Sequence, residues 1–97
     1  MLLMAKISVL PSIYKEEDVR NLRNSFGKHV AKMKESGKLL SGWGLAGGRG
    51  AFLLFNVNSG EELLDLLSPV VLDHTNVEVY PVLELEKLGE FFKKYAK

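Results

Sequence analysis

Two apolar segments joined by a glycine-rich connection most constrain the fold of this chain. Residues 39–46 and 51–57 read as strands, and the connection between them is Gly47-Gly48-Arg49-Gly50. This arrangement predicts a β-hairpin, because glycine adopts positive φ without steric cost. One face of the first arm is expected to carry Leu39, Ser41, Trp43 and Leu45, and the other Leu40, Gly42, Gly44 and Ala46. The glycine-bearing face leaves room for a close neighbour.

Two further strands and a first helix flank this hairpin. Residues 2–10 and 76–85 alternate apolar and polar side chains, which predicts strands. Pro81 cannot donate a ladder hydrogen bond, so the later strand is expected at a sheet edge. An amphipathic helix is predicted from Glu16 to a stop at Gly37, because acidic residues begin it, basic residues end it, and apolar residues recur every three or four positions.

Two shorter helices complete the predicted elements. Ser59 and Glu62 have the spacing of a capping box and start a helix that Pro69 is expected to stop, with a loop over residues 69–75. A last helix is predicted over residues 86–95.

The order strand, helix, strand, strand, helix, strand is typical of α+β, ferredoxin-like folds. We expect one domain over residues 1–97, in which two helices cover one face of a four-stranded antiparallel sheet and an extra helix follows at the C-terminus. A second copy is expected to cover the other sheet face, giving a homodimer or a larger homo-oligomer. Lys6 and Glu78 should share that open face and could form an ion pair.

Composition excludes several classes of function. The 13 basic and 12 acidic side chains give a net charge of +1, which offers no electrostatic case for nucleic acid or an anionic membrane as partner. The chain has no cysteine, so disulfides and thiolate sites are excluded. The N-terminal segment lacks the features of a signal peptide, and no segment reaches the roughly 20 apolar residues of a membrane span. We therefore expect a cytoplasmic protein.

The motifs for cofactors and metals are weak. Gly42, Gly44 and Gly47 spell GxGxxG, but they run from a strand into a hairpin and not into a helix, so nucleotide binding is not expected. His29 and His74 are far apart in sequence without clustered partners, which predicts no metal site. We expect no cofactor. His29 lies one turn beyond Phe26, where it is either core packing or a candidate general base.

With these elements placed, the chain resembles the muconolactone isomerase family, small dimeric α+β barrel proteins of aromatic-ring degradation. The resemblance covers roughly residues 1–85 and is carried by Leu22-Arg23, Gly37-Lys38, Trp43, Gly47, Phe55-Asn56-Val57, Glu62-Leu63, Leu67 and Val77-Glu78-Val79. It implies a ferredoxin-like protomer, sheet-to-sheet dimers and a pocket between sheet and helices. It also implies isomerisation of an unsaturated lactone by proton movement, without metal or cofactor.

Two departures from the family concern the reaction itself. The position of the family's first-helix glutamate is Phe26 here, and Gly44 stands where the family has a basic side chain after the tryptophan. His29 is then the candidate replacement base, and Arg49 or Lys6 the candidate anchor for a substrate carboxylate.

We therefore expect a protein that binds a small organic acid or lactone, with cofactor-free proton-shift isomerisation as the candidate reaction. Its candidate catalytic residue is His29, and its candidate substrate-binding residues are Phe26, Trp43, Phe55, Arg49 and Lys6. Packing in the core or at an interface is the alternative role of the three aromatic residues. Two other functions remain open: a non-catalytic ligand-sensing or assembly domain, and a cofactor-independent monooxygenase-like barrel.

Overall fold

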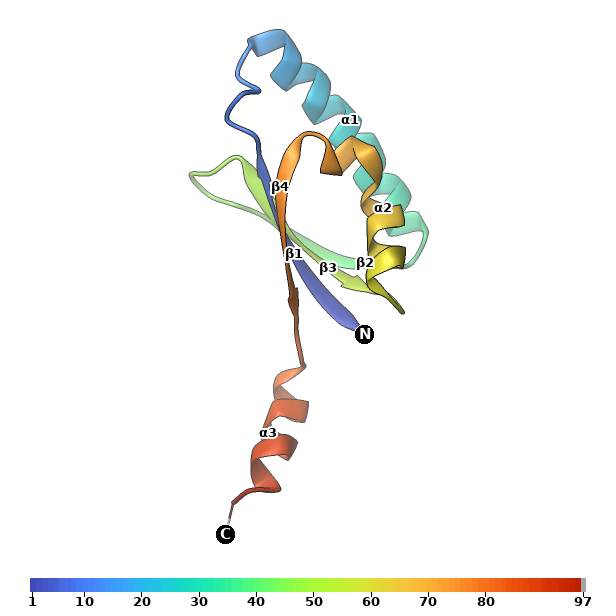
Figure 1. Cartoon of the computed structure of the whole chain (residues 1–97), viewed down its shortest axis with the longest axis vertical. Helices are drawn as coiled ribbons and strands as arrows, with labels where there is room; N and C mark the ends of the chain where they lie inside the picture. The colour runs from blue at the N-terminus through green and yellow to red at the C-terminus, as the bar shows by residue number, and fades with distance from the viewer. Residues whose placement is uncertain (97) are drawn as a thin grey trace.

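The computed structural model describes residues 1–96, which form four strands and three helices. In chain order these are β1 (Leu2–Val9), α1 (Glu16–Glu35), β2 (Leu39–Gly44), β3 (Gly50–Asn56), α2 (Gly60–Leu72), β4 (Thr75–Pro81) and α3 (Leu85–Lys93). The strands make one antiparallel sheet in the order β2-β3-β1-β4, with α1 and α2 on one face (Figure 1). The expected ferredoxin-like α+β fold with an extra C-terminal helix is confirmed.

Strand β1 lies inside the sheet and divides its side chains between the two faces as its alternation predicts. Leu3, Ala5 and Ile7 are buried beneath the helices, whereas Met4 and Lys6 lie half-buried on the opposite, open face. The helix-facing core is built from apolar residues of all four strands and both helices, among them Met33, Leu53, Phe55, Leu63, Leu67, Val71 and Val77. Strand β4 is at the edge, which confirms the position predicted from Pro81.

A β-bulge in β2 changes which side chains share a face. Leu39 pairs with Phe55 and Ser41 pairs with Leu54, which leaves Leu40 as an extra residue between them. Leu39 therefore faces the helices. After the bulge, Ser41 and Trp43 face the open side of the sheet, beside Leu54 and Phe52. The prediction that Leu39 and Trp43 share a face was wrong, because simple alternation does not include the bulge.

Two glycines of the hairpin permit close approaches. A Cβ on Gly42 would lie 2.9 Å from Cδ2 of Leu53, so the close neighbour of the bare β2 face is a side chain of the adjacent strand. A Cβ on Gly50 would overlap the carbonyl oxygen of Ile7 in β1. The β1–β3 pairing at this end therefore requires glycine at position 50.

We expect Gly50→Ala to lower the free energy of unfolding by about 3 kcal/mol, because the added methyl group must displace the β1 backbone. Urea denaturation followed by circular dichroism measures this change. Gly44→Ala is the matched control, since a Cβ there meets nothing within 4 Å. Equal stability of the two variants would contradict the requirement for glycine at position 50.

Helix α2 differs from the sequence prediction at its C-terminal end. The helix breaks at Ser68, whose φ is 58° and ψ 171°, and a further helical turn begins at Pro69. Ser68 Oγ accepts a hydrogen bond from the Val70 N–H at 3.3 Å. Proline fits this first-turn position because its missing N–H is not needed there. The loop expected over residues 69–75 was therefore wrong.

The last elements also have different bounds from those predicted. Strand β4 ends at Pro81 rather than at residue 85, and α3 starts at Leu85. The connection between them is three residues long. Helix α3 does not join the core, since none of its residues is buried.

The N-terminus of α2 is joined to the start of β2 by a charged contact. Ser59 Oγ accepts from the Glu62 N–H at 3.1 Å, and the Glu62 carboxylate accepts from the Asn58 N–H at 3.0 Å. Lys38 Nζ lies 3.0 Å from the same carboxylate. The Asn58 hydrogen bond, with a further contribution from Lys38, holds the pKa of Glu62 below its ordinary value of 4.5.

A carboxyl group with a lowered pKa in the folded state contributes stability above its unfolded pKa and loses it as the pH falls. We therefore expect Glu62→Gln to lower Tm by roughly 1–3 °C at pH 7, and the difference from wild type to shrink as the pH falls below 4.5. Thermal unfolding at a series of pH values measures it. A difference that does not depend on pH would contradict the role of the charge.

Candidate functional site

An apolar cavity of about 320 Å³ lies between α1 and the sheet. Its walls come from α1, from β1 and β3, and from α2, and its apolar lining consists of Ile7, Val9, Val19, Leu22, Phe26, Val30, Met33, Ala51, Leu53 and Val71. The spacing of these α1 residues is the amphipathic stripe that the sequence shows. The cavity is of the size and apolar character that small-molecule sites have.

Two arginines are the charged residues of the cavity lining. Arg23 comes from α1 and Arg49 from the β2–β3 turn, and both are exposed, so they lie where the cavity meets solvent. Arg49 Nη2 donates a hydrogen bond to the carbonyl oxygen of Ile13, which joins the turn to the segment between β1 and α1. A guanidinium group is positively charged at physiological pH and pairs well with carboxylates. The site therefore suits a molecule with an apolar body and a carboxylate.

None of the cavity-lining residues within the described chain is an Asp, Glu, His, Lys or Tyr. Proton abstraction from carbon needs a group that can accept a proton near the reacting atom. The lining as it stands can bind and orient an anion, but it supplies no general base.

His29 lies at the contact between α1 and α2 and not in the cavity lining. Its Nε2 is 2.7 Å from the carbonyl oxygen of Leu66, to which it can donate. In an unbroken helix that carbonyl would accept from Val70, but the break at Ser68 redirects the Val70 N–H to Ser68 Oγ. His29 thus links α1 to the part of α2 that lies directly before the break.

We expect His29→Ala to lower the free energy of unfolding by about 1 kcal/mol, because the half-buried Leu66 carbonyl loses its side-chain donor. Denaturant unfolding measures the change. Lys28→Ala, at the neighbouring exposed position, is the control and should leave stability nearly unchanged. A His29→Ala variant as stable as this control would contradict the structural role.

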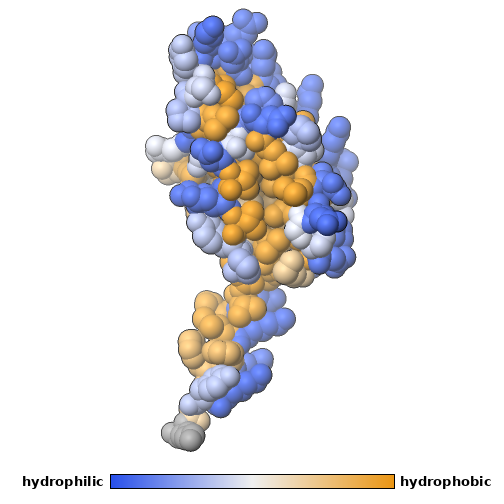
Figure 2. Space-filling view, in the orientation of Figure 1, coloured by the Kyte–Doolittle hydropathy of each residue, from blue (hydrophilic) through white to orange (hydrophobic). Residues whose placement is uncertain are grey.

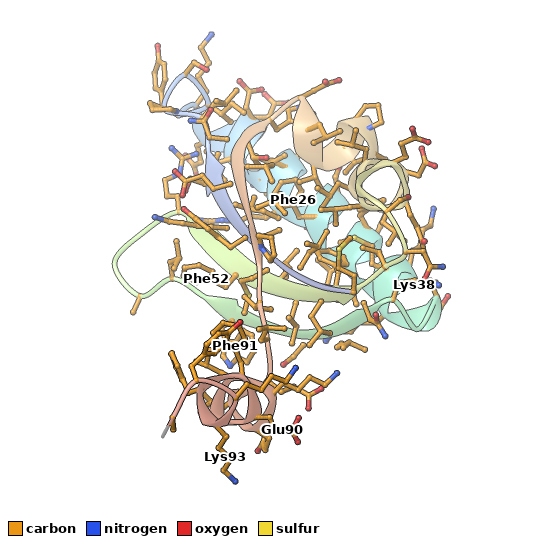
Figure 3. The ribbon with its side chains drawn as sticks, turned by 60° about the horizontal axis from the view of Figure 1, so that its bottom comes forward. Phe26, Lys38, Phe52, Glu90, Phe91 and Lys93 are labelled. Atoms are coloured by element: carbon orange, nitrogen blue, oxygen red, sulfur yellow. The ribbon has the colours of Figure 1, made fainter. Side chains whose placement is uncertain are left out.

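The predicted site residues fall on both sides of the sheet. Phe26 and Arg49 line the cavity. Figure 3 shows the two sides of the sheet: Phe26 lies on the side of the helices, and Phe52, the neighbour of Trp43 in the sheet, lies on the open side. Phe55 is fully buried in the core. Trp43 and Lys6 face away from the cavity on the open sheet face, Trp43 because of the bulge and Lys6 because it occupies an even position of β1.

The open face carries two rows of side chains across the strands. One row consists of Ser41, Leu54, Met4 and Tyr80, and the next of Trp43, Phe52, Lys6 and Glu78. Tyr80 donates its hydroxyl to Glu78 at 2.7 Å, and this hydrogen bond raises the pKa of Tyr80. Among residues 1–96 the two ion pairs are Arg20–Glu16 and Lys38–Glu62, so the anticipated Lys6–Glu78 pair does not form.

Arg23 is the charged lining residue that sequence reasoning did not single out as a site residue. It lies three residues before Phe26, and residues at this spacing share one side of a helix. A basic residue at this distance from an apolar stripe is the signal that could have identified it. That signal is weak, because most charged residues beside such a stripe are simply solvated.

Neither a membrane-spanning helix nor a metal-binding cluster is found among the described residues. None of the helices in the described part of the chain is long and apolar enough to cross a membrane. Residues 1–96 contain no group of three or more His, Asp or Glu side chains arranged to hold a metal ion.

Comparison with known proteins agrees with this architecture. The crystal structure of muconolactone isomerase superposes with a TM-score of 0.70 at 20% sequence identity, covering 87% of this chain and 90% of the other. At this identity the similarity concerns the fold. No curated protein sequence matches. The model of a family described as a domain of unknown function, DUF3303, matches residues 1–96, and the chain therefore belongs to the DUF3303 family.

Proposed function

We propose that this protein binds a small organic acid or a carboxylate-bearing lactone in the cavity between α1 and the sheet. The observation that carries the proposal is the pair of arginines, Arg23 and Arg49, at the exposed edge of an otherwise apolar cavity. An apolar body would fill the cavity, and the carboxylate would remain at the edge, where a guanidinium can pair with it without full burial of the charge.

The fold shared with muconolactone isomerase supports a ligand of this class. Muconolactone combines an unsaturated ring with one carboxylate, which matches one apolar volume and a cationic edge. It is therefore the first compound to test.

We expect Arg49→Gln and Arg23→Gln each to weaken muconolactone binding about tenfold, because a charge-assisted hydrogen bond contributes about 1.5–3 kcal/mol. Isothermal titration calorimetry, or ligand-observed NMR for weak binding, measures the change. Arg20→Gln is the matched control, since Arg20 is on the same helix but pairs with Glu16 outside the cavity lining.

The methyl ester of the same lactone separates charge from shape. It should bind wild type and both arginine variants with the same low affinity, because it lacks the anion. Equal binding of acid and ester to the wild type would contradict the role of the arginines, and absence of binding by either compound would remove this ligand class.

Proton-shift isomerisation is the more specific activity, and His29 remains its candidate base. For that role the ring would have to leave the Leu66 carbonyl and turn toward the cavity. Proton NMR of muconolactone in deuterium oxide tests this directly. Deuterium uptake that is lost in His29→Ala but kept in Lys28→Ala would support catalysis; absence of uptake beside measurable binding would favour the ligand-sensing alternative.

We also propose that two copies associate through the open sheet face. Trp43 and Tyr80 are about half exposed there, and Met4, Phe52 and Leu54 are only partly covered. Apolar side chains gathered on one face of a small protein favour association. This surface lies on the opposite side of the sheet from the cavity, so both functions can coexist in one protomer.

A further inference from the structure

Helix α3 extends away from the rest of the molecule. The last ladder contact, from the Val82 N–H to the Leu2 carbonyl at 3.2 Å, directs the chain past the end of the sheet (Figure 1). The radius of gyration is 15.8 Å, whereas a compact chain of this length has about 12–13 Å. None of the residues of α3 is buried.

The side chains of α3 separate into an apolar and a charged side. Glu86, Lys87, Glu90 and Lys93 occupy one side. The other side carries Leu85, Leu88, Phe91 and Phe92, and Tyr95 follows directly after the helix. Phe91 contacts Phe92 and Tyr95, with ring centroids 5.7 and 5.1 Å apart. Figure 2 shows the apolar side of α3 continuing from the apolar surface above it, and in Figure 3 Phe91 points toward the sheet while Glu90 and Lys93 point away.

A helix of nine residues is marginal by itself in water. An apolar side with Leu85 80% and Phe92 60% exposed adds a further cost, because large apolar side chains favour burial. The helix therefore needs a surface that its own chain does not provide in this conformation.

We propose that α3 of each copy packs on the β2–β3 part of the open sheet face of a second copy, against Trp43, Phe52 and Leu54. This inference rests on the association through the open face proposed above and names the element that completes it. The β4 part of the face is more polar, with Asn76 and the Tyr80–Glu78 hydrogen bond, and is the less suitable partner for an apolar helix.

A second copy fits better than an unrelated partner because the chain carries both unpartnered surfaces. In a twofold dimer each α3 contacts the sheet of the other chain. The apolar side of α3 and the open sheet face are then covered in both copies. Five mostly large side chains and their sheet counterparts correspond to roughly 1,000 Å² of buried surface per arm, and two arms reach about 2,000 Å², the area of a stable dimer.

We expect Phe91→Glu to raise the dimer dissociation constant at least 30-fold, because it places a charge at the centre of the contact. Analytical ultracentrifugation of the full chain across the micromolar range measures it. Lys93→Gln changes the charge by the same amount on the polar side and should leave the constant unchanged. Since α3 contributes nothing to the core, circular dichroism should show both variants folded.

The same measurements separate this inference from the association proposed earlier. A wild-type chain that stays monomeric overturns both. A wild-type dimer that Trp43→Glu dissociates but Phe91→Glu does not overturns the role of α3 and leaves the sheet-face association standing.

Cysteine cross-linking locates the contact, because the chain has no natural cysteine. Leu88→Cys and Ser41→Cys copies are mixed, oxidised with diamide and analysed by mass spectrometry. A disulfide between Leu88→Cys of one copy and Ser41→Cys of another supports packing of α3 on the sheet of the second copy. This holds provided that Lys93→Cys forms markedly less disulfide with Ser41→Cys. Equal yields from Leu88→Cys and Lys93→Cys, or no mixed product from a wild-type-like dimer, overturn the placement.

Discussion

The burial of one face of the β1–β3 pair is the constraint on which the rest of this structure depends. Ala5 and Phe55 are completely inaccessible at the centre of that face, and both covering helices pack over it. Because successive strand residues point to opposite faces, burying these two commits Met4, Lys6 and Phe52 to the other side. Within residues 1–96, α1 and α2 both lie on the buried face, so neither of them covers the second face.

The cavity and the open face therefore differ in chemical character. The cavity lies where α1 passes over β1 and β3, and its two arginines come from an exposed helix position and a hairpin turn, where a charge can stay hydrated. The open face presents aromatic and aliphatic side chains around Lys6 and Glu78, which suits contact with another protein surface better than enclosure of a small molecule. The sheet separates the two.

Sequence reasoning predicted the fold further than the site. The pattern of each element is local, so the order of strands and helices follows from periodicity, capping residues and glycine or proline positions. The site depends on which side each residue finally faces. Trp43 was assigned to the pocket, but the bulge at Leu40 reverses its side relative to Leu39. His29 contacts the Leu66 carbonyl of α2, more than thirty residues later in the chain, directly before the break at Ser68.

The sequence by itself determined the element order, the two faces of β1, the edge position of β4 and the amphipathic character of α1 and α3, because these follow from neighbouring residues along the chain. Only the tertiary structure decided that Arg23 and Arg49 line one cavity, that Lys6 and Trp43 lie across the sheet from it, and that α3 leaves the body of its own chain. These outcomes depend on strand register and on the direction in which β4 ends, and both are set by contacts between residues far apart in sequence.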